Sequence, residues 1–259
     1  MSYTYHDNFL VPLNLVWVSG MHGSGKDTVI NNVLSAPNLD KLPYKVLRYK
    51  KCEMTSFDDL FERQTRRIAK YGIDWYRSIG MAIKNPDSIV LADRCYHDAR
   101  CYIEGFYYLD WLTEKQQDWL LDILDEQFAL WSTEDIKPFL LYPPLSHIEK
   151  NLETRHEQTQ SKKWREEDEE YNKAIYDSYT LYFTDDSDYH VFGEDAYEEY
   201  DIPEFEPGYK CTATNMVDQA IELQKYMTEC WEKFMDSDQP MMMERKQYDW
   251  FHPIMEWGK

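Results

Sequence analysis

The 259-residue sequence predicts an α/β fold, a five-stranded parallel sheet with helices on both faces. Three observations predict it. Five short apolar runs alternate along the chain with longer stretches whose apolar residues recur at helical spacing. The runs are apolar throughout, which is typical of strands buried on both faces. The first run leads directly into a glycine-rich turn and then into a helix.

The first half of the chain supplies three of these strands. They are expected at residues 14–19, 44–49 and 88–92. Helices are expected at residues 28–34, 56–70, 75–83 and 96–109. Pro37 follows the first helix and Pro86 the third, as expected where a helix cannot continue. Ser56, with Asp59 three residues later, is typical of a helix N-terminus.

The second half supplies the remaining two strands, at residues 137–142 and 209–214. Helices are expected at residues 113–131, 145–155, 164–181 and 215–234. Thr113 and Gln116 form a capping-box pattern ahead of the first of these. We therefore expect one domain over residues 1–236, followed by a tail at 237–259 rich in Met and aromatic residues. Such a tail packs on the body of the protein or on a second subunit, so a homodimer is one expectation.

The net charge of −20 disfavours long nucleic acid as a partner. Half of that charge lies in an insertion at about residues 184–206, which has ten Asp or Glu and no Lys or Arg, so a local basic pocket elsewhere stays open. No run of residues is long and apolar enough for a membrane span, and no signal peptide is expected. The five cysteines form no CxxC pair, which predicts reduced thiols and a cytoplasmic protein.

The glycine-rich turn lies in LVWVSGMHGSGKDTVI, residues 15–30. A strand, a turn with three glycines, a lysine and a helix in this order predict a P-loop, whose backbone N–H groups bind the phosphates of ATP. The ATP-binding residues are then Gly20, Met21, His22, Gly23, Ser24, Gly25, Lys26, Asp27 and Thr28. Lys26 would act in catalysis by reaching the β- and γ-phosphates. The alternative is a glycine-rich turn that binds no ligand.

Asp27 departs from the usual loop, which has a hydroxyl residue after the lysine. A carboxylate is a hard oxygen ligand and could bind Mg²⁺, with Thr28 beside it. The alternative is an acidic residue that the helix dipole favours at an N-terminus. The sequence leaves both interpretations open.

Asp93 and Arg94 follow directly on the third strand. The carboxyl edge of a parallel sheet is where ligands of such folds bind, so both side chains are expected there. Asp93 could hold Mg²⁺, and Arg94 could neutralise charge on the transferred phosphoryl group. A surface ion pair at the end of a strand is the alternative.

The polar connection between two of the later helices, at about residues 150–171, carries several basic residues. We expect it to act as a lid that brings Arg155 and Lys162 to ATP and Arg165 to the reacting phosphates. The alternative is a solvated charged face.

These motifs resemble those of the deoxynucleoside kinases and thymidylate kinases, over about residues 13–234. Asp93, Arg94 and Arg100 match the acid and two arginines of a family motif, and the GSGKDT ending is similar to loops of some phage deoxynucleotide kinases. Cys95 and Ala99 depart from that motif. The resemblance implies a P-loop fold with a five-stranded parallel sheet, ATP and Mg²⁺ as cosubstrates, and a small-molecule nucleoside or nucleotide as the acceptor.

Two acceptors remain open. A deoxynucleoside has a neutral hydroxyl and requires a base, for which Glu53 is the candidate. A deoxynucleoside monophosphate requires cations that position it. The candidates for acceptor binding are Arg48, Gln64, Arg67 and Arg100, although Arg63, Arg66 and Arg67 could instead face solvent. The resemblance favours the monophosphate; a kinase of DNA ends or of modified bases, and a non-catalytic nucleotide sensor, are further alternatives.

Overall fold

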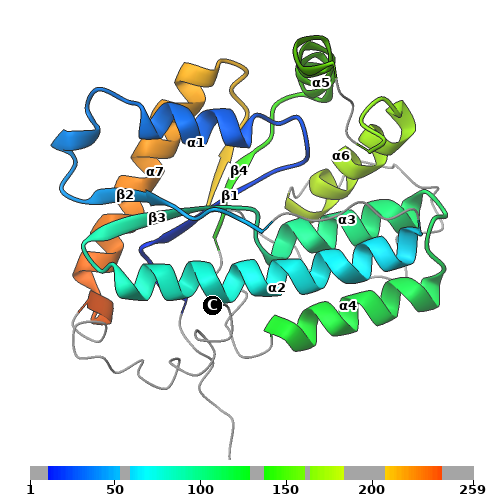
Figure 1. Cartoon of the computed structure of the whole chain (residues 1–259), viewed down its shortest axis with the longest axis horizontal. Helices are drawn as coiled ribbons and strands as arrows, with labels where there is room; N and C mark the ends of the chain where they lie inside the picture. Colours follow the sequence, from blue (N-terminus) through cyan, green and yellow to red (C-terminus); the bar gives the residue numbers. More distant parts are fainter. Residues whose placement is uncertain (1–10, 53–58, 129–136, 161–163, 184–207, 241–259) are drawn as a thin grey trace, which may run out of the picture.

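The computed structural model describes residues 11–52, 59–128, 137–160, 164–183 and 208–240. Its strands are β1 (Leu15–Ser19), β2 (Lys45–Arg48), β3 (Ser88–Asp93), β4 (Phe139–Leu141) and β5 (Tyr209–Cys211). They form one parallel sheet in the order β2-β3-β1-β4-β5 (Figure 1). The expected five-stranded parallel sheet is therefore confirmed.

The helices fill the intervals between the strands. They are α1 (Lys26–Leu34), the short 3₁₀ helix η1 (Leu39–Lys41), α2 (Leu60–Lys84), α3 (Tyr96–Tyr108), α4 (Glu114–Phe128), α5 (Leu145–Thr159), α6 (Glu169–Phe183) and α7 (Met216–Asp236). None of the described helices combines the length and the apolar character that crossing a membrane requires.

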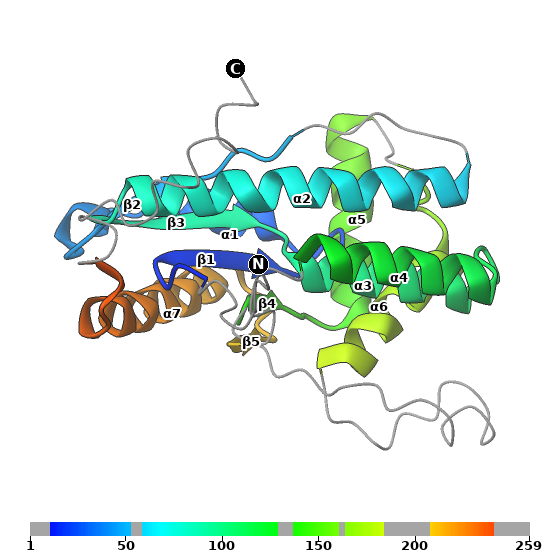
Figure 2. The ribbon, with the colours of Figure 1, turned by 90° about the horizontal axis from the view of Figure 1, so that it is seen from below.

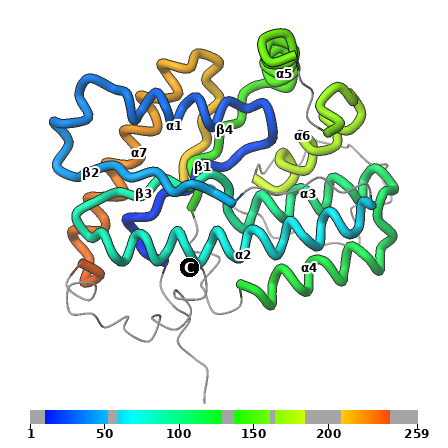
Figure 3. Tube along the Cα trace, in the orientation of Figure 1, coloured from blue at the N-terminus to red at the C-terminus, as the bar shows by residue number. Residues whose placement is uncertain are grey.

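Helices cover both faces of the sheet because successive side chains of a strand point to opposite faces. In β1, Val16 and Val18 belong to a core cluster shared with α1 and α7. Leu15 and Trp17 belong to the cluster shared with α2, α3, α4 and α6. Figure 2 shows α7 and α2 on opposite sides of the strands. In Figure 3, α1 (blue) and α7 (orange) lie side by side although they come from opposite ends of the chain.

The register of the sheet brings two separate motifs together. Val18, near the end of β1, lies opposite Asp93, the last residue of β3. The turn that follows β1 and the Asp93-Arg94 pair that ends β3 therefore share the carboxyl edge of the sheet. This is the arrangement that the sequence predicts.

The expectation of two helices between β2 and β3 is wrong, because α2 runs unbroken from Leu60 to Lys84. Gly72 does not interrupt it; the side chain of Gln127 from α4 packs directly on this glycine, in the space that a Cβ would take. The helix begins at Asp59, whose side chain accepts a hydrogen bond from Glu62 N at 2.6 Å. Residue 56 lies outside the described residues.

The helix expected at residues 164–181 starts later than expected, because α6 begins at Glu169. Residues 164–167 form turns, in which Arg165 has a φ of 54°. A residue with a positive φ does not fit a right-handed helix. The acidic insertion falls on residues that the structure does not describe, as does the tail beyond residue 240. The start of the tail packs on the body, where Gln239 bonds Leu13 N and Val11 O.

Candidate active site

The glycine-rich turn has the backbone that its sequence predicts. Gly20, Gly23 and Gly25 all have positive φ, from 79° to 135°. Gly20 is the most restricted, because a Cβ there would lie 2.5 Å from the carbonyl oxygen of Leu141. A backbone atom in a buried strand cannot move aside, so only glycine fits at this position.

Lys26 occupies the centre of the turn. Its Nζ donates hydrogen bonds to the carbonyl oxygens of Gly20 and Met21, both at 2.6 Å, and to Ser24 Oγ at 3.3 Å. Burial, together with the positive charge of Arg94, lowers the pKa of Lys26 to about 7. The side chain therefore lies within the turn, held by two of its backbone carbonyl groups.

Asp27 and Thr28 are exposed at the start of α1. Oδ1 of Asp27 accepts a hydrogen bond from Arg48, which also donates to Asn31 Oδ1 at 2.6 Å. The structure therefore pairs two of the predicted site residues with each other and joins the end of β2 to α1. An acid in this first turn is also favoured by the helix dipole.

Asp93 is buried at the end of β3. Its Oδ2 forms an ion pair with Lys51, and its Oδ1 has no hydrogen-bond partner among the described residues. Burial alone would raise the pKa of Asp93, but the positive charges of Lys26, Lys51 and Arg94 outweigh burial and lower it. The alternative of a surface ion pair at this strand end is excluded, since the Asp93 side chain is 3% exposed.

Arg94 turns inward from the end of the strand. Its backbone has a φ of 72°, which is unusual for a residue with a side chain. The guanidinium donates to Tyr102 Oη at 3.1 Å, and its Nη1 lies 3.5 Å from Asp98 Oδ1. These contacts hold a positive charge beside the glycine-rich turn.

Asp98 is a site residue that the sequence analysis did not identify. Its carboxylate is fully buried and accepts four hydrogen bonds, from Ser19 Oγ, Gly20 N, Cys95 N and Tyr179 Oη, at 2.5 to 3.1 Å. It connects the first residues of the turn to α3 and α6. Its partners Gly20 and Tyr179 lie 78 and 81 residues away along the chain, so no local sequence pattern marked it.

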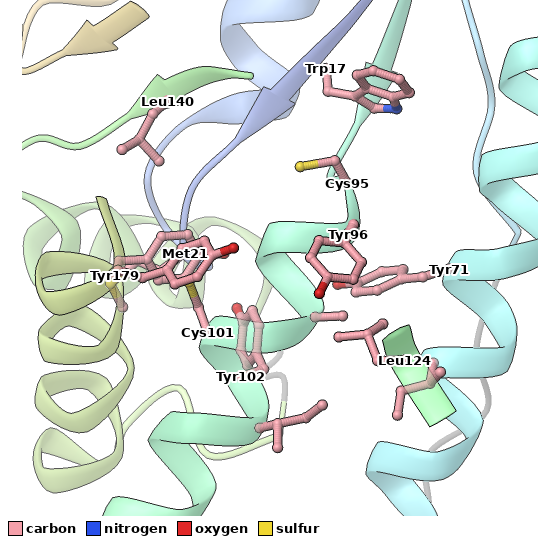
Figure 4. Close-up of a cluster of buried hydrophobic side chains, with 14 of the residues drawn as sticks. Trp17, Met21, Tyr71, Cys95, Tyr96, Cys101, Tyr102, Leu124, Leu140 and Tyr179 are labelled. Atoms are coloured by element: carbon pink, nitrogen blue, oxygen red, sulfur yellow. The ribbon is translucent and has the colours of Figure 1, made fainter. Parts of the chain in front are cut away.

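Figure 4 shows the packing beneath this edge of the sheet, with Trp17, Tyr71, Tyr102 and Tyr179 gathered between β1, α2, α3 and α6. Trp17 also stacks on Trp75 of α2, with ring centroids 4.6 Å apart. Aromatic side chains thus form a rigid base for the site.

A cleft of about 860 Å³ opens beside Asp93 and Arg94, between the end of β2 and α2. Arg67 of α2 lines it, with its guanidinium 4.2 Å from the centroid of the Tyr102 ring. Gln64 is fully buried; its Oε1 accepts from Arg67, and its Nε2 has no hydrogen-bond partner in the described part of the chain. Both residues were predicted to bind an acceptor, and the structure places them together.

The neighbouring arginines of α2 differ in their surroundings. Arg63 is buried over the ring of Trp164, at 3.9 Å, whereas Arg66 is exposed and paired with Glu62. The alternative of solvent-facing arginines therefore holds for Arg66 and is wrong for Arg63 and Arg67.

Arg100 lies away from the cleft lining. It pairs with Glu104 at 3.9 Å and approaches the ring of Tyr182. The structure does not bring it together with Arg67 and Gln64.

Of the predicted lid residues, Arg155 lies in α5 and Arg165 in the turns that precede α6. Arg155 forms an ion pair with Glu166, and Arg165 lies 4.3 Å over the ring of Trp111. Glu53 and Lys162 lie outside the described residues.

His22 connects the glycine-rich turn to α6. Its ring bonds Tyr102 Oη at 3.0 Å and Asn172 Oδ1 at 2.7 Å, and it stacks on Tyr171 at 5.1 Å. Burial and the nearby charges of Arg94, Lys26 and Arg67 lower the pKa of His22 to about 3, against the opposing effect of the Asn172 hydrogen bond. The imidazole is therefore neutral at pH 7.

The residues present fit a magnesium ion delivered with phosphates. Mg²⁺ is usually bound by one or two carboxylates plus phosphate oxygens and water. Asp93 offers a buried, unpartnered Oδ1 among the described groups. Among the described residues no three His, Cys, Asp or Glu side chains form a cluster that could hold a metal on their own.

No family model and no curated protein matches the chain. Solved structures do match it. The deoxyadenosine kinase from M. mycoides with bound dATP aligns with 83% of this chain and 99% of its own, at 15% identity and a TM-score of 0.51. The same enzyme with the products dCMP and a flexible dCDP gives 13% identity and a TM-score of 0.48, and with dCTP 16% and 0.45. At this identity the likeness shows the fold: the chain has the P-loop α/β fold of a deoxyadenosine kinase.

Proposed function

We propose that this protein transfers the γ-phosphoryl group of ATP to a deoxynucleoside monophosphate. One observation carries the choice of acceptor. The cleft beside Asp93 is lined by six cationic side chains and one carboxylate, in a chain whose net charge is −20. A cluster of positive charges in a protein whose net charge is negative favours an acceptor that is itself anionic.

Each residue has a role that follows from its position. The glycine-rich turn binds the triphosphate, and Lys26 leaves its carbonyl partners to meet the β- and γ-phosphates. Arg94, fixed by Tyr102 and Asp98, stabilises the charge on the transferred group. Asp93, with Asp27 and Thr28 at the start of α1, would hold Mg²⁺, which neutralises phosphate charge when bound.

The acceptor is held on the other side of the cleft. Arg67 and Gln64 are adjacent on α2 and are joined by a hydrogen bond of 3.1 Å. Arg67 lines the cleft and can pair with the acceptor phosphate. Gln64 is fully buried and does not line the cleft, so its Nε2, which has no hydrogen-bond partner among the described residues, can donate to a base edge only if the side chain turns into the cleft. Arg155 and Arg165 would approach ATP from the lid. Because all five cysteines are free thiols, we place the reaction in the reducing cytoplasm.

A second candidate is phosphorylation of a deoxynucleoside, with Glu53 as the base. It is favoured by one observation, that Cys52, which precedes Glu53, lines the cleft. The two candidates differ in whether the acceptor needs a base. A monophosphate oxygen is already anionic, whereas a 5′-hydroxyl must lose its proton during transfer.

An acceptor screen tests the proposal. ADP release is measured with ATP, Mg²⁺ and each of the deoxynucleosides, their monophosphates and a DNA oligonucleotide. We expect one or more monophosphates to raise the rate at least tenfold over the deoxynucleosides. A rate that rises only with DNA, or only with deoxynucleosides, contradicts the proposal.

The Glu53→Gln variant separates the two candidates further. We expect its kcat to fall less than fivefold on the monophosphate, since no base is required. A loss of a hundredfold or more, of the size that general-base catalysis contributes, would support the deoxynucleoside instead. Glu114→Gln, at the exposed start of α4, is the matched control.

A further inference from the structure

Lys51 and Asp93 form an ion pair, and both line the cleft. The two side chains differ in how far they are exposed to solvent. The Asp93 side chain is 3% exposed and fixed at the end of β3, whereas the Lys51 side chain is 38% exposed. Lys51 belongs to the segment that follows β2 and lines the cleft. If the pair separates, the ammonium moves and the carboxylate stays.

The ion pair with Lys51 occupies the Asp93 carboxylate, which is the group in the cleft best suited to bind a metal. Asp93 is the carboxylate that lines the cleft, and its Oδ1 is buried without a hydrogen-bond partner among the described groups. A magnesium ion at this carboxylate and the ammonium of Lys51 on its other oxygen would repel each other at close range. The carboxylate becomes a better metal ligand when Lys51 leaves it.

The other cations of the cleft include several that already have partners. The full set is Arg48, Lys50, Lys51, Arg67, Lys70 and Arg94. Arg48 is paired with Asp27, Lys70 with Asp74, and Arg94 with Asp98. These partners do not line the cleft, whereas Asp93, the partner of Lys51, does. An anion that enters the cleft therefore competes with Asp93 for Lys51, beside the cations Lys50 and Arg67, which also line it.

We propose that Lys51 determines specificity for an anionic acceptor by having two partners in turn, which rests on the function proposed above. In the free protein its ammonium pairs with Asp93. In the complex it pairs with the phosphate of the acceptor, which carries more charge than a carboxylate. Binding of the acceptor thereby leaves Asp93 to the metal that accompanies ATP, and the metal site is completed only when a phosphorylated acceptor is present.

The first test measures binding without ATP. Calorimetric titration gives the affinities of the wild type and of Lys51→Met for a deoxynucleoside monophosphate and for its deoxynucleoside. We expect Lys51→Met to bind the monophosphate at least tenfold more weakly and the deoxynucleoside within threefold of the wild type. The matched control is Lys45→Met, at the start of β2 and paired with Asp87 at the surface, and it should change neither affinity more than twofold.

The second test measures the metal. Binding of Mn²⁺ with ADP is followed by electron paramagnetic resonance, with no acceptor present. We expect Lys51→Met to bind Mn²⁺ about fivefold more tightly than the wild type, because Asp93 is free. Adding the monophosphate should tighten Mn²⁺ binding in the wild type and leave the variant unchanged. Lys51→Gln, which also removes the positive charge, should behave as Lys51→Met does and replaces it if that variant does not fold.

The outcomes separate this inference from the function on which it rests. If the wild type binds the monophosphate and neither Lys51 variant alters that affinity or the Mn²⁺ affinity, the role of Lys51 is wrong and the proposed function stands. Equal losses for monophosphate and deoxynucleoside also overturn the role of Lys51, because they indicate a general disturbance of the cleft. If the wild type binds no monophosphate at all, the proposed function fails and the inference with it.

Discussion

Replacing Asp98 by alanine should destabilise the protein by about 3–5 kcal/mol. The substitution removes the acceptor of the Gly20 and Cys95 backbone N–H groups, both buried, and each orphaned donor costs about 1–3 kcal/mol. It also leaves the buried Arg94 without its nearest carboxylate, at 3.5 Å, and removing one partner of a buried ion pair costs about 3–5 kcal/mol in measured cases. These costs overlap, so we take 3–5 kcal/mol as the expected total.

Urea unfolding, followed by the fluorescence of the nine tryptophans, measures this loss directly. Tyr179→Phe removes a single donor to the same carboxylate and should cost about 1.5 kcal/mol, and Asp98→Asn, which keeps one acceptor oxygen, should fall between the two. A loss below about 1 kcal/mol for Asp98→Ala, or a larger loss for Tyr179→Phe than for Asp98→Ala, would refute the reasoning. ADP affinity should fall in the same order, since Asp98 holds the start of the glycine-rich turn.

Three further predictions concern the glycine-rich turn. Lys26→Ala should lower ADP affinity at least tenfold by isothermal calorimetry while the urea midpoint stays within about 0.5 M, and full affinity would exclude the role of Lys26. Gly20→Ala should cost more than about 2 kcal/mol of unfolding free energy, because its Cβ would meet the Leu141 carbonyl; wild-type stability would contradict this contact. The pKa of His22 is about 3 in the folded protein against about 6.5 unfolded, so the unfolded state binds the additional proton, and stability is lost as pH falls from about 6.5 towards 3. His22→Gln should therefore reduce the loss of unfolding free energy between pH 6.5 and 5 by at most about 2 kcal/mol, measured by urea unfolding at both pH values. A pH profile of stability that does not change in the variant would show that His22 is not the cause of this loss.

The parallel sheet and the place of the site were predictable from the sequence because they depend on local patterns. Apolar runs identify strands, and the residues that follow a parallel strand lie at its carboxyl edge whatever the rest of the fold does. For this reason the glycine-rich turn and Asp93-Arg94 were found without knowledge of strand order. The pairing of Val18 with Asp93 then puts them side by side.

Other features depend on contacts between distant segments and gave no local signal. The break expected between residues 70 and 75 does not occur; α2 continues through Gly72, on which a side chain from α4 packs. Asp98 serves the site through Gly20 and Tyr179, which lie 78 and 81 residues away along the chain. Lys51 could have been predicted as a site residue, because it follows a strand at the carboxyl edge of the sheet. Its ion pair with Asp93 could not, because it depends on the pairing of β2 with β3.

The position of His22 restricts how the start of α6 can move relative to the glycine-rich turn. Its ring is bonded to Asn172 and stacked on Tyr171, so the first turn of α6 is anchored to the glycine-rich turn. The residues just before α6 are also held, because Trp164 packs on Phe106 and the carbonyl oxygen of Glu166 accepts a hydrogen bond from Asn172. A displacement of the glycine-rich turn would therefore carry the start of α6 with it, and we expect the two segments to move together.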